Sequence, residues 1–174
     1  DGAGRDVAYV KQKLFKLKED ITVFENASQT TPIYKIKANQ WIDWSASYIL
    51  SDAAGHELGR MGRKGGRSLW KATYEIFDAS NTKEFKIEED NAFVKIMDAV
   101  FSEIPILGIF TGYVFNPKYN IFNEKGEKVA EFAKESSFLG KKFKLHQLSD
   151  LNVQEEERII LSLMMMVLLE RSRG

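Results

Sequence analysis

The sequence predicts a mainly β protein, in which about eleven or twelve short antiparallel strands surround one apolar C-terminal helix. Three observations predict this fold. The chain ends in a run of apolar residues, most of the remaining chain alternates over short stretches, and one strand-turn pattern recurs. Hairpins at regular spacing favour a closed barrel or a sandwich. A barrel of this size leaves a wide lumen, and we expect the apolar helix to fill it.

The C-terminal run spans residues 159–169 and is apolar at every position except Ser162. Acidic residues precede it at 155–157 and basic residues follow at Arg171 and Arg173, an order that favours a helix because of the helix dipole. At roughly 16 Å the run is too short for a bilayer, which needs about 20 apolar residues. We therefore expect protein to enclose this helix on all sides.

Alternating stretches and turn residues predict the strands. The predicted strands are 10–17, 21–24, 32–36, 48–50, 56–61, 69–78, 84–88, 106–115, 119–123, 128–134 and 142–148. The glycine-rich stretch 62–68 is predicted to be a loop, because three of its residues are glycines and glycine weakens a strand.

An internal repeat supports the hairpin order. Four short strands end in an acidic or amide turn residue, and they begin at Ile21, Tyr48, Tyr74 and Tyr119. The last interval is longer than the others by about 19 residues, which an inserted element explains. Apolar residues at helical spacing predict an amphipathic helix over 91–104 that packs on the sheet. A helix that contacts a membrane is the alternative there, but the segment lacks a polar face rich in Lys and Arg.

Composition fits one domain. The chain has 174 residues and 44% hydrophobic residues, so we expect a single domain over 10–174 and a disordered tail or cloning remnant over 1–9. Lys plus Arg balance Asp plus Glu at 25 each, which gives no bulk attraction to nucleic acid. The absence of cysteine excludes disulfides and thiolate chemistry and agrees with a cytoplasmic location.

The densest group of cations is the main candidate site. Glycines interleaved with cations allow backbone N–H groups and positive charges to converge on a phosphate. A solvated loop between strands is the alternative. The candidate residues for an anionic headgroup are Arg60, Arg63, Lys64, Arg67 and Lys71, with Lys141 and Lys142 as a second group.

Catalytic patterns are absent from the sequence. The two histidines, His56 and His146, lie far apart in the chain, and no phosphate-binding loop, nucleophile elbow or zinc motif is present. We expect no enzymatic activity, no catalytic residue, no metal and no cofactor.

Three stretches together resemble the LURP-one-related proteins of the tubby C-terminal-like superfamily, which also includes the phospholipid scramblases. They are residues 11–15, the repeated pattern of residues 74–78, and the glutamate-rich turn that leads into the apolar helix. The resemblance covers about residues 10–170 and implies a barrel of about 12 strands around a central C-terminal helix. The segment 90–105 departs from the simplest members.

For function, the resemblance implies binding at membranes rather than catalysis. The first hypothesis is a non-enzymatic module, cytoplasmic and peripheral at the membrane, that binds anionic phospholipid headgroups as a phosphoinositide-binding or scramblase-like protein does. The alternative is a soluble protein-interaction or structural scaffold without a lipid ligand. The chain lacks the cysteine-rich segment of scramblases.

Overall fold

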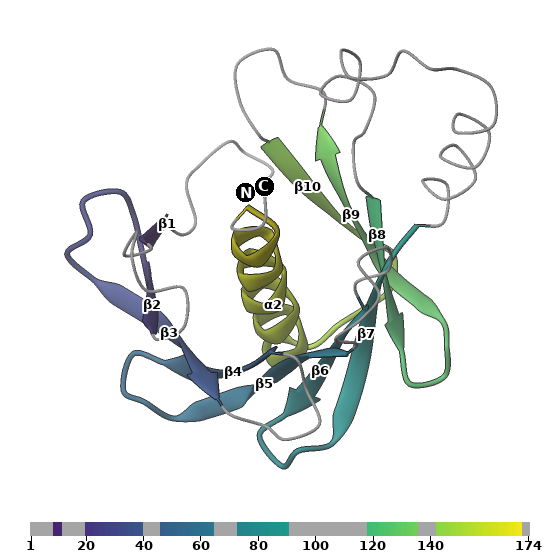
Figure 1. The fold of residues 1–174 in the computed structure, drawn as a ribbon, viewed down its shortest axis with the longest axis horizontal. Coiled ribbons are helices and arrows are strands. Elements are labelled where there is room, and N and C mark those ends of the chain that lie inside the picture. Colours follow the sequence, from purple (N-terminus) through teal and green to yellow (C-terminus); the bar gives the residue numbers. More distant parts are fainter. Residues whose placement is uncertain are drawn as a thin grey trace, which may run out of the picture.

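The computed structural model describes residues 9–11, 20–39, 46–64, 73–90, 118–135 and 142–171. Within these residues, ten strands form one antiparallel sheet in which each strand pairs with its neighbours in the sequence. The sheet curves around a single long helix, α2 (Figure 1). The elements are β1 (Tyr9–Lys11), β2 (Asp20–Phe24), β3 (Pro32–Asn39), β4 (Ala46–Asp52), β5 (Glu57–Lys64), β6 (Thr73–Asp78), β7 (Lys83–Glu89), β8 (Lys118–Asn123), β9 (Lys128–Glu135), β10 (Lys142–Gln147) and α2 (Val153–Arg171).

The predicted internal repeat is confirmed as four similar hairpins, β2–β3, β4–β5, β6–β7 and β8–β9. In each hairpin the register shifts near the end of the first strand. The residue at that end, Glu25, Asp52, Asp78 or Asn123, then closes the turn with a backbone hydrogen bond. In three of the hairpins its side chain also accepts a backbone N–H from across the turn. Bulges increase the local twist and bend of a sheet, so the repeated bulge helps to curve this one.

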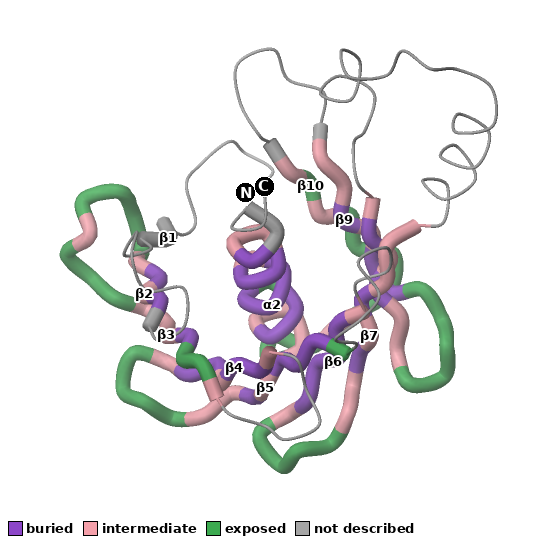
Figure 2. Tube along the Cα trace, in the orientation of Figure 1, coloured by how far each residue is buried: buried purple, intermediate pink, exposed green. Residues whose placement is uncertain are grey.

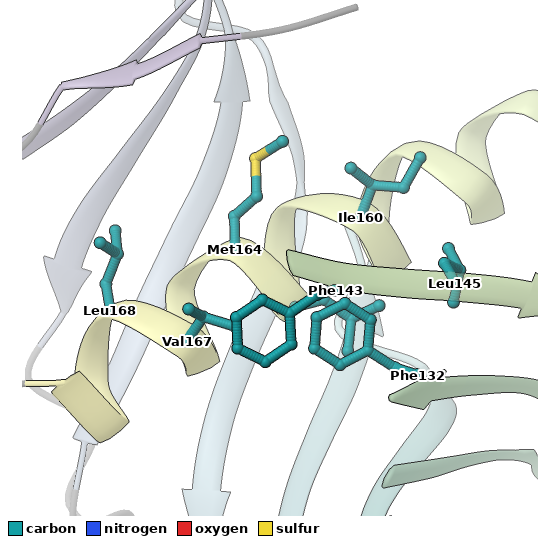
Figure 3. A pocket seen from close by; sticks show the side chains of 8 residues that line it. Phe132, Phe143, Leu145, Ile160, Met164, Val167 and Leu168 are labelled. Carbon is teal, nitrogen blue, oxygen red and sulfur yellow. The ribbon is translucent and has the colours of Figure 1, made fainter. Parts of the chain in front are cut away.

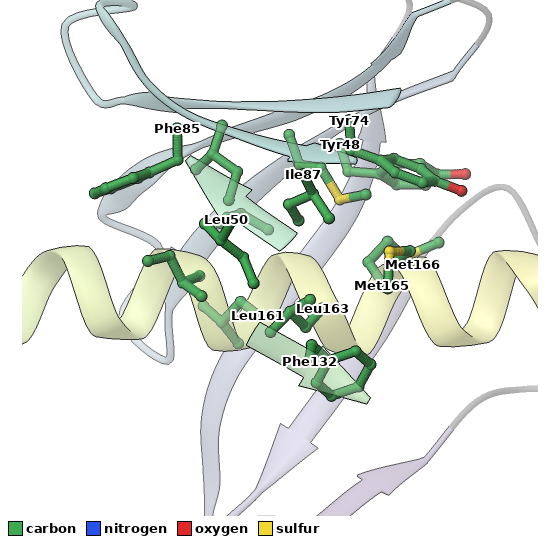
Figure 4. Packing of buried hydrophobic residues seen from close by; sticks show 14 of the residues in the cluster. Tyr48, Leu50, Tyr74, Phe85, Ile87, Phe132, Leu161, Leu163, Met165 and Met166 are labelled. Carbon is green, nitrogen blue, oxygen red and sulfur yellow. The ribbon is translucent and has the colours of Figure 1, made fainter. Parts of the chain in front are cut away.

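The inner face of the sheet carries the core. Buried residues gather in the strands around α2 and in α2 itself (Figure 2), and most of them are apolar. In the middle of the sheet, the pairs Tyr48↔Met61 and Met61↔Ile76 continue one apolar row across β4, β5 and β6. Figure 4 shows Leu161, Leu163, Met165 and Met166 of α2 packed among these strands. The core is therefore a helix against a sheet rather than a sheet against a sheet.

Helix α2 begins with a reciprocal cap. The N–H of Glu155 donates to Oδ1 of Asn152 at 2.9 Å, and the N–H of Asn152 donates to Oε2 of Glu155 at 2.8 Å. This arrangement satisfies donors that a helix N-terminus otherwise leaves without partners. Among the described residues, no helix is both long and apolar enough to cross a bilayer.

Two polar contacts fix the first turns of α2 against opposite parts of the sheet. Arg158, which is 6% exposed, donates from Nε and Nη2 to the two carboxylate oxygens of Glu84, both at 2.7 Å. Its Nη1 donates to the carbonyl of Leu58 at 3.2 Å. On the other side, the hydroxyl of Tyr34 donates to Glu157 at 2.8 Å. Burial, together with this hydrogen bond, raises the pKa of Tyr34 to about 12.

Gly59 allows the close approach of α2 to β5. A Cβ atom at this position would lie 2.2 Å from the carbonyl oxygen of Phe77 and 2.7 Å from Cδ of Arg158. Any side chain here would displace either the strand or the arginine.

The structure corrects two expectations from the sequence. Residues 62–64 were expected in a loop, but they continue β5, because Gly62 pairs with Ser47 on one side and Glu75 on the other. Helix α2 is also not covered on all sides by the described residues, since Ile160 is 41% exposed.

Other expectations stay predictions. No ladder joins β1 to β10 among the described residues, so the closed barrel of about 12 strands that the resemblance implies stays a prediction. The helix predicted over 91–104 and the strand over 106–115 lie outside the described residues, as do most of 10–17 and the start of 69–78.

The Arg158–Glu84 contact gives a direct test of how α2 is held. In Glu84→Gln, the buried guanidinium loses its counter-charge, and we expect the free energy of unfolding to fall by roughly 3 kcal/mol. Glu57→Gln removes the carboxylate partner of Arg60, a more exposed pair, and should cost less than about 1 kcal/mol. Urea unfolding of both variants measures the change in the free energy of unfolding. Equal losses would contradict the idea that the Arg158–Glu84 contact holds α2 against the sheet.

Candidate functional site

The predicted cluster of cations does not gather on one face of the sheet. Arg60 and Lys64 alternate with Arg63 along β5, and alternate residues of a strand point to opposite faces. Arg63 shares the inner face with Met61 and is only 7% exposed. Of the three described members of this group, Arg60 and Lys64 therefore lie on the outer face and Arg63 lies on the inner face.

The two outer cations of β5 contact carboxylates. Nε of Arg60 lies 2.6 Å from Oε1 of Glu57. Nζ of Lys64 lies 3.3 Å from Oε1 of Glu75, which also contacts Nζ of Lys83 at 3.1 Å. The acidic partners neutralise much of the positive charge on this part of the outer face.

The other predicted headgroup residues cannot be placed as a group. Arg67, Lys71 and Lys141 lie outside the described residues. Lys142 is the first residue of β10. Their part in a headgroup site stays a prediction.

A second basic surface lies on the outer face of β8, β9 and β10. Lys118 pairs in register with Ala133, and Ala133 pairs with Lys144, so the two lysines flank one small residue. Lys128 lies on the same side, because it contacts Glu131, which also contacts Lys118 at 2.9 Å. We call Lys118, Lys128 and Lys144 the basic face.

Two described carboxylates act on this face: Glu131 contacts Lys118 and Lys128, and Asp90 attracts Lys118. Hydrogen bonds from Lys128 and Lys118 lower the pKa of Glu131 to about 2. Glu131 thus stays ionised near neutral pH and balances one of the three lysines. Lys144 is exposed and has no carboxylate partner among the described side chains.

Sequence reasoning missed the basic face because its lysines come from three strands. One signal was available: Lys142, Lys144 and His146 alternate with Phe143 and Leu145. This pattern predicts a strand with a basic side and an apolar side.

The apolar side of the same strands forms one wall of a groove of about 340 Å³ (Figure 3). Its sheet wall consists of Phe132, Phe143 and Leu145. Its helix wall consists of Ile160, Leu163, Met164, Val167 and Leu168 of α2. No polar side chain lines the groove among the described residues.

Aromatic stacking shapes the sheet wall. The rings of Phe132 and Phe143 stack with centroids 5.1 Å apart and planes within 3°. Tyr119 lies behind Phe132 at a centroid distance of 6.4 Å. Stacking of aromatic rings is a favourable arrangement, so each phenylalanine supports the position of the other in this wall.

A cation occupies the next position on the groove side of β9. Lys134 pairs in register with Phe143, and directly opposed residues project from the same face of a sheet. No carboxylate pairs with Lys134 among the described side chains. Lys134 does not itself line the groove, but its place in the sheet puts a cation beside the lining residue Phe143.

The histidines lie in separate elements. His56 lies at the β4–β5 turn, where its Nδ1 is 2.8 Å from Asp52, and its side chain is 81% exposed. His146 lies in β10 and is exposed. Within the described residues, no group of three His, Asp or Glu residues is arranged to hold a metal ion.

Comparison with known proteins gives one match. The family model described as LURP-one-related matches residues 7–170. No curated protein and no solved structure matches the chain.

The opposite environments of Arg63 and Lys64 predict opposite responses to mutation. Arg63→Glu places a carboxylate on the buried inner face and should lower the free energy of unfolding by about 3 kcal/mol or more. Lys64→Gln, one residue away on the exposed face, should change it by less than about 1 kcal/mol. Thermal and urea unfolding measure the stability of both variants. If Arg63→Glu left the free energy of unfolding unchanged, Arg63 would have to face solvent.

Proposed function

Because the chain belongs to the LURP-one-related family, we propose that it is a non-enzymatic binding module for anionic phospholipid headgroups at a membrane surface. It would act as a peripheral protein of the cytoplasm. The likeness of its hairpins and C-terminal helix to the tubby C-terminal-like superfamily supports this proposal. The same likeness supports the finer proposal of a closed, tubby-like barrel.

The basic face is the observation that carries the headgroup proposal. Lys118 and Lys128 contact Glu131, Asp90 also attracts Lys118, and Lys144 is exposed without a described carboxylate partner. A lysine near an anionic leaflet contributes about 1 kcal/mol. The small excess of positive charge on this face then gives a weak, reversible attraction that falls with ionic strength. Such a weak affinity suits a protein that binds a membrane reversibly.

The basic face is a better candidate than the described part of β5. There, Arg60 and Lys64 contact Glu57 and Glu75, and Arg63 is buried on the inner face. Four further residues remain candidates for the headgroup site, and each would add positive charge to the outer face of β5 or to the basic face: Arg67, Lys71, Lys141 and Lys142.

Co-sedimentation with liposomes tests the proposal. We expect the wild-type protein to bind vesicles that contain phosphatidylserine or phosphoinositide, and to be released by salt. Lys118→Glu with Lys144→Glu reverses two charges of the basic face and should abolish binding. Lys35→Glu with Lys37→Glu makes the same change in net charge on β3, which lies far from β8–β10 in the strand order. This variant should retain most of the binding to vesicles.

Two results would contradict the proposal. Equal loss of binding in both double variants would show that only net charge matters. Absence of wild-type binding to every anionic vesicle would favour the alternative, a soluble protein-interaction or structural scaffold. Circular dichroism of each variant confirms that the fold is retained.

A further inference from the structure

The groove between α2 and β9–β10 differs from the rest of the core because it is open. Ile160 and Val167 are seven residues apart, so they lie on one stripe of the helix. Elsewhere on α2, Ile159, Leu161 and Met165 are at most 1% exposed. Along this stripe Ile160 is 41% exposed and Val167 is half-buried. The helix thus presents an apolar strip to a space that the described residues leave open.

The lining restricts the chemistry of what can occupy this space. An extended peptide would bring one N–H and one C=O per residue into a groove whose described lining side chains are all apolar. Burying such groups without hydrogen-bond partners is unfavourable. A hydrocarbon chain carries no such cost and is stabilised by each CH₂ group that it buries. The volume of about 340 Å³ falls in the range of small-ligand sites.

The charge beside the groove restricts the polar part of the occupant. Lys134 projects from the groove side of β9, opposite Phe143. A ligand with its hydrocarbon chain between Phe143 and Val167 would place its polar end near this ammonium group. An anionic end is complementary to this ammonium group and can form a weak ion pair with it at a partly exposed position.

From this combination we propose that the groove binds a free long-chain fatty acid, with the acyl chain along α2 and the carboxylate at Lys134. The site is independent of the basic face, because it lies on the other side of the sheet. The protein would then hold a single lipid molecule in addition to contacting headgroups.

Fluorescence titration with cis-parinaric acid, a fluorescent fatty acid, tests the site below the micellar concentration. We expect saturable binding of one molecule per chain. Val167→Trp fills the groove and should weaken binding at least about tenfold, by analogy with overpacked cores. Val153→Trp is the matched control: it lies on the same helical stripe, outside the groove, and Val153 is 71% exposed. It should leave the affinity unchanged.

A second pair of variants tests the charge. Lys134→Gln should weaken binding of the acid about fivefold, the upper range for an exposed ion pair, and should not affect competition by the corresponding fatty alcohol. Lys125→Gln, in the exposed β8–β9 turn, should have no effect. Lys118→Glu with Lys144→Glu should also leave this titration unchanged, so a failure of the headgroup proposal and a failure of this one give different results.

Methionine methyl NMR reports on the groove without any mutation. Adding oleate to the wild-type protein should shift the methyl signal of Met164, which lines the groove, and not that of Met61, which is fully buried in the core. An unchanged Met164 signal, equal effects of Val167→Trp and Val153→Trp, or contacts from residues 91–117 of the chain itself to Met164 would each overturn the proposal.

Discussion

Burial of α2 against the inner face of one curved sheet is the interaction on which the rest of this fold depends. Its sequence between 159 and 169 has almost no polar side chain, so the helix is unstable in water without a partner. Each large apolar side chain that leaves water contributes about 1.5–3 kcal/mol. Five such residues of α2 are at most 3% exposed: Ile159, Leu161, Leu163, Met165 and Met166. Their summed contribution is comparable to the whole net stability of a typical domain, about 5–15 kcal/mol.

The same constraint explains several local features. The sheet has to bend around a cylinder, and the bulge repeated in four hairpins provides curvature. Gly59 allows β5 to approach the helix. Arg158 and Glu157 fix the rotation of the helix by contacting β7 and β3. Burial raises the pKa of Glu84, although Arg158 beside it favours the ionised form.

The two proposed lipid contacts use opposite sides of the same strands. On the outer side, β8, β9 and β10 carry Lys118, Lys128 and Lys144, of which Lys118 and Lys128 contact Glu131. On the inner side, Phe132, Phe143 and Leu145 face the open strip of α2. A two-sided strand can therefore serve a charged ligand and an apolar ligand without any shared side chain.

Local patterns predicted most of this fold. Alternation located β2, β3 and β4 and the strands from β6 to β10, and the acidic turn before the apolar run located α2. Gly62 was misleading, because pairing with strands on both sides outweighs a weak local preference. The candidate site was harder to predict. Alternation in β5 separates Arg63 from Lys64, and the basic face joins residues from three strands that only the register brings together.

The most direct measurement of how α2 is buried uses single cysteines, since the chain has none of its own. Cysteines placed singly at Ile159, Ile160, Leu161 and Met165 are labelled with a maleimide under native conditions. The structure predicts rapid labelling at 160 alone, and slow labelling, limited by opening of the fold, at the other three. Equal labelling rates at all four positions would contradict a helix that is packed against the sheet on one side and open on the other.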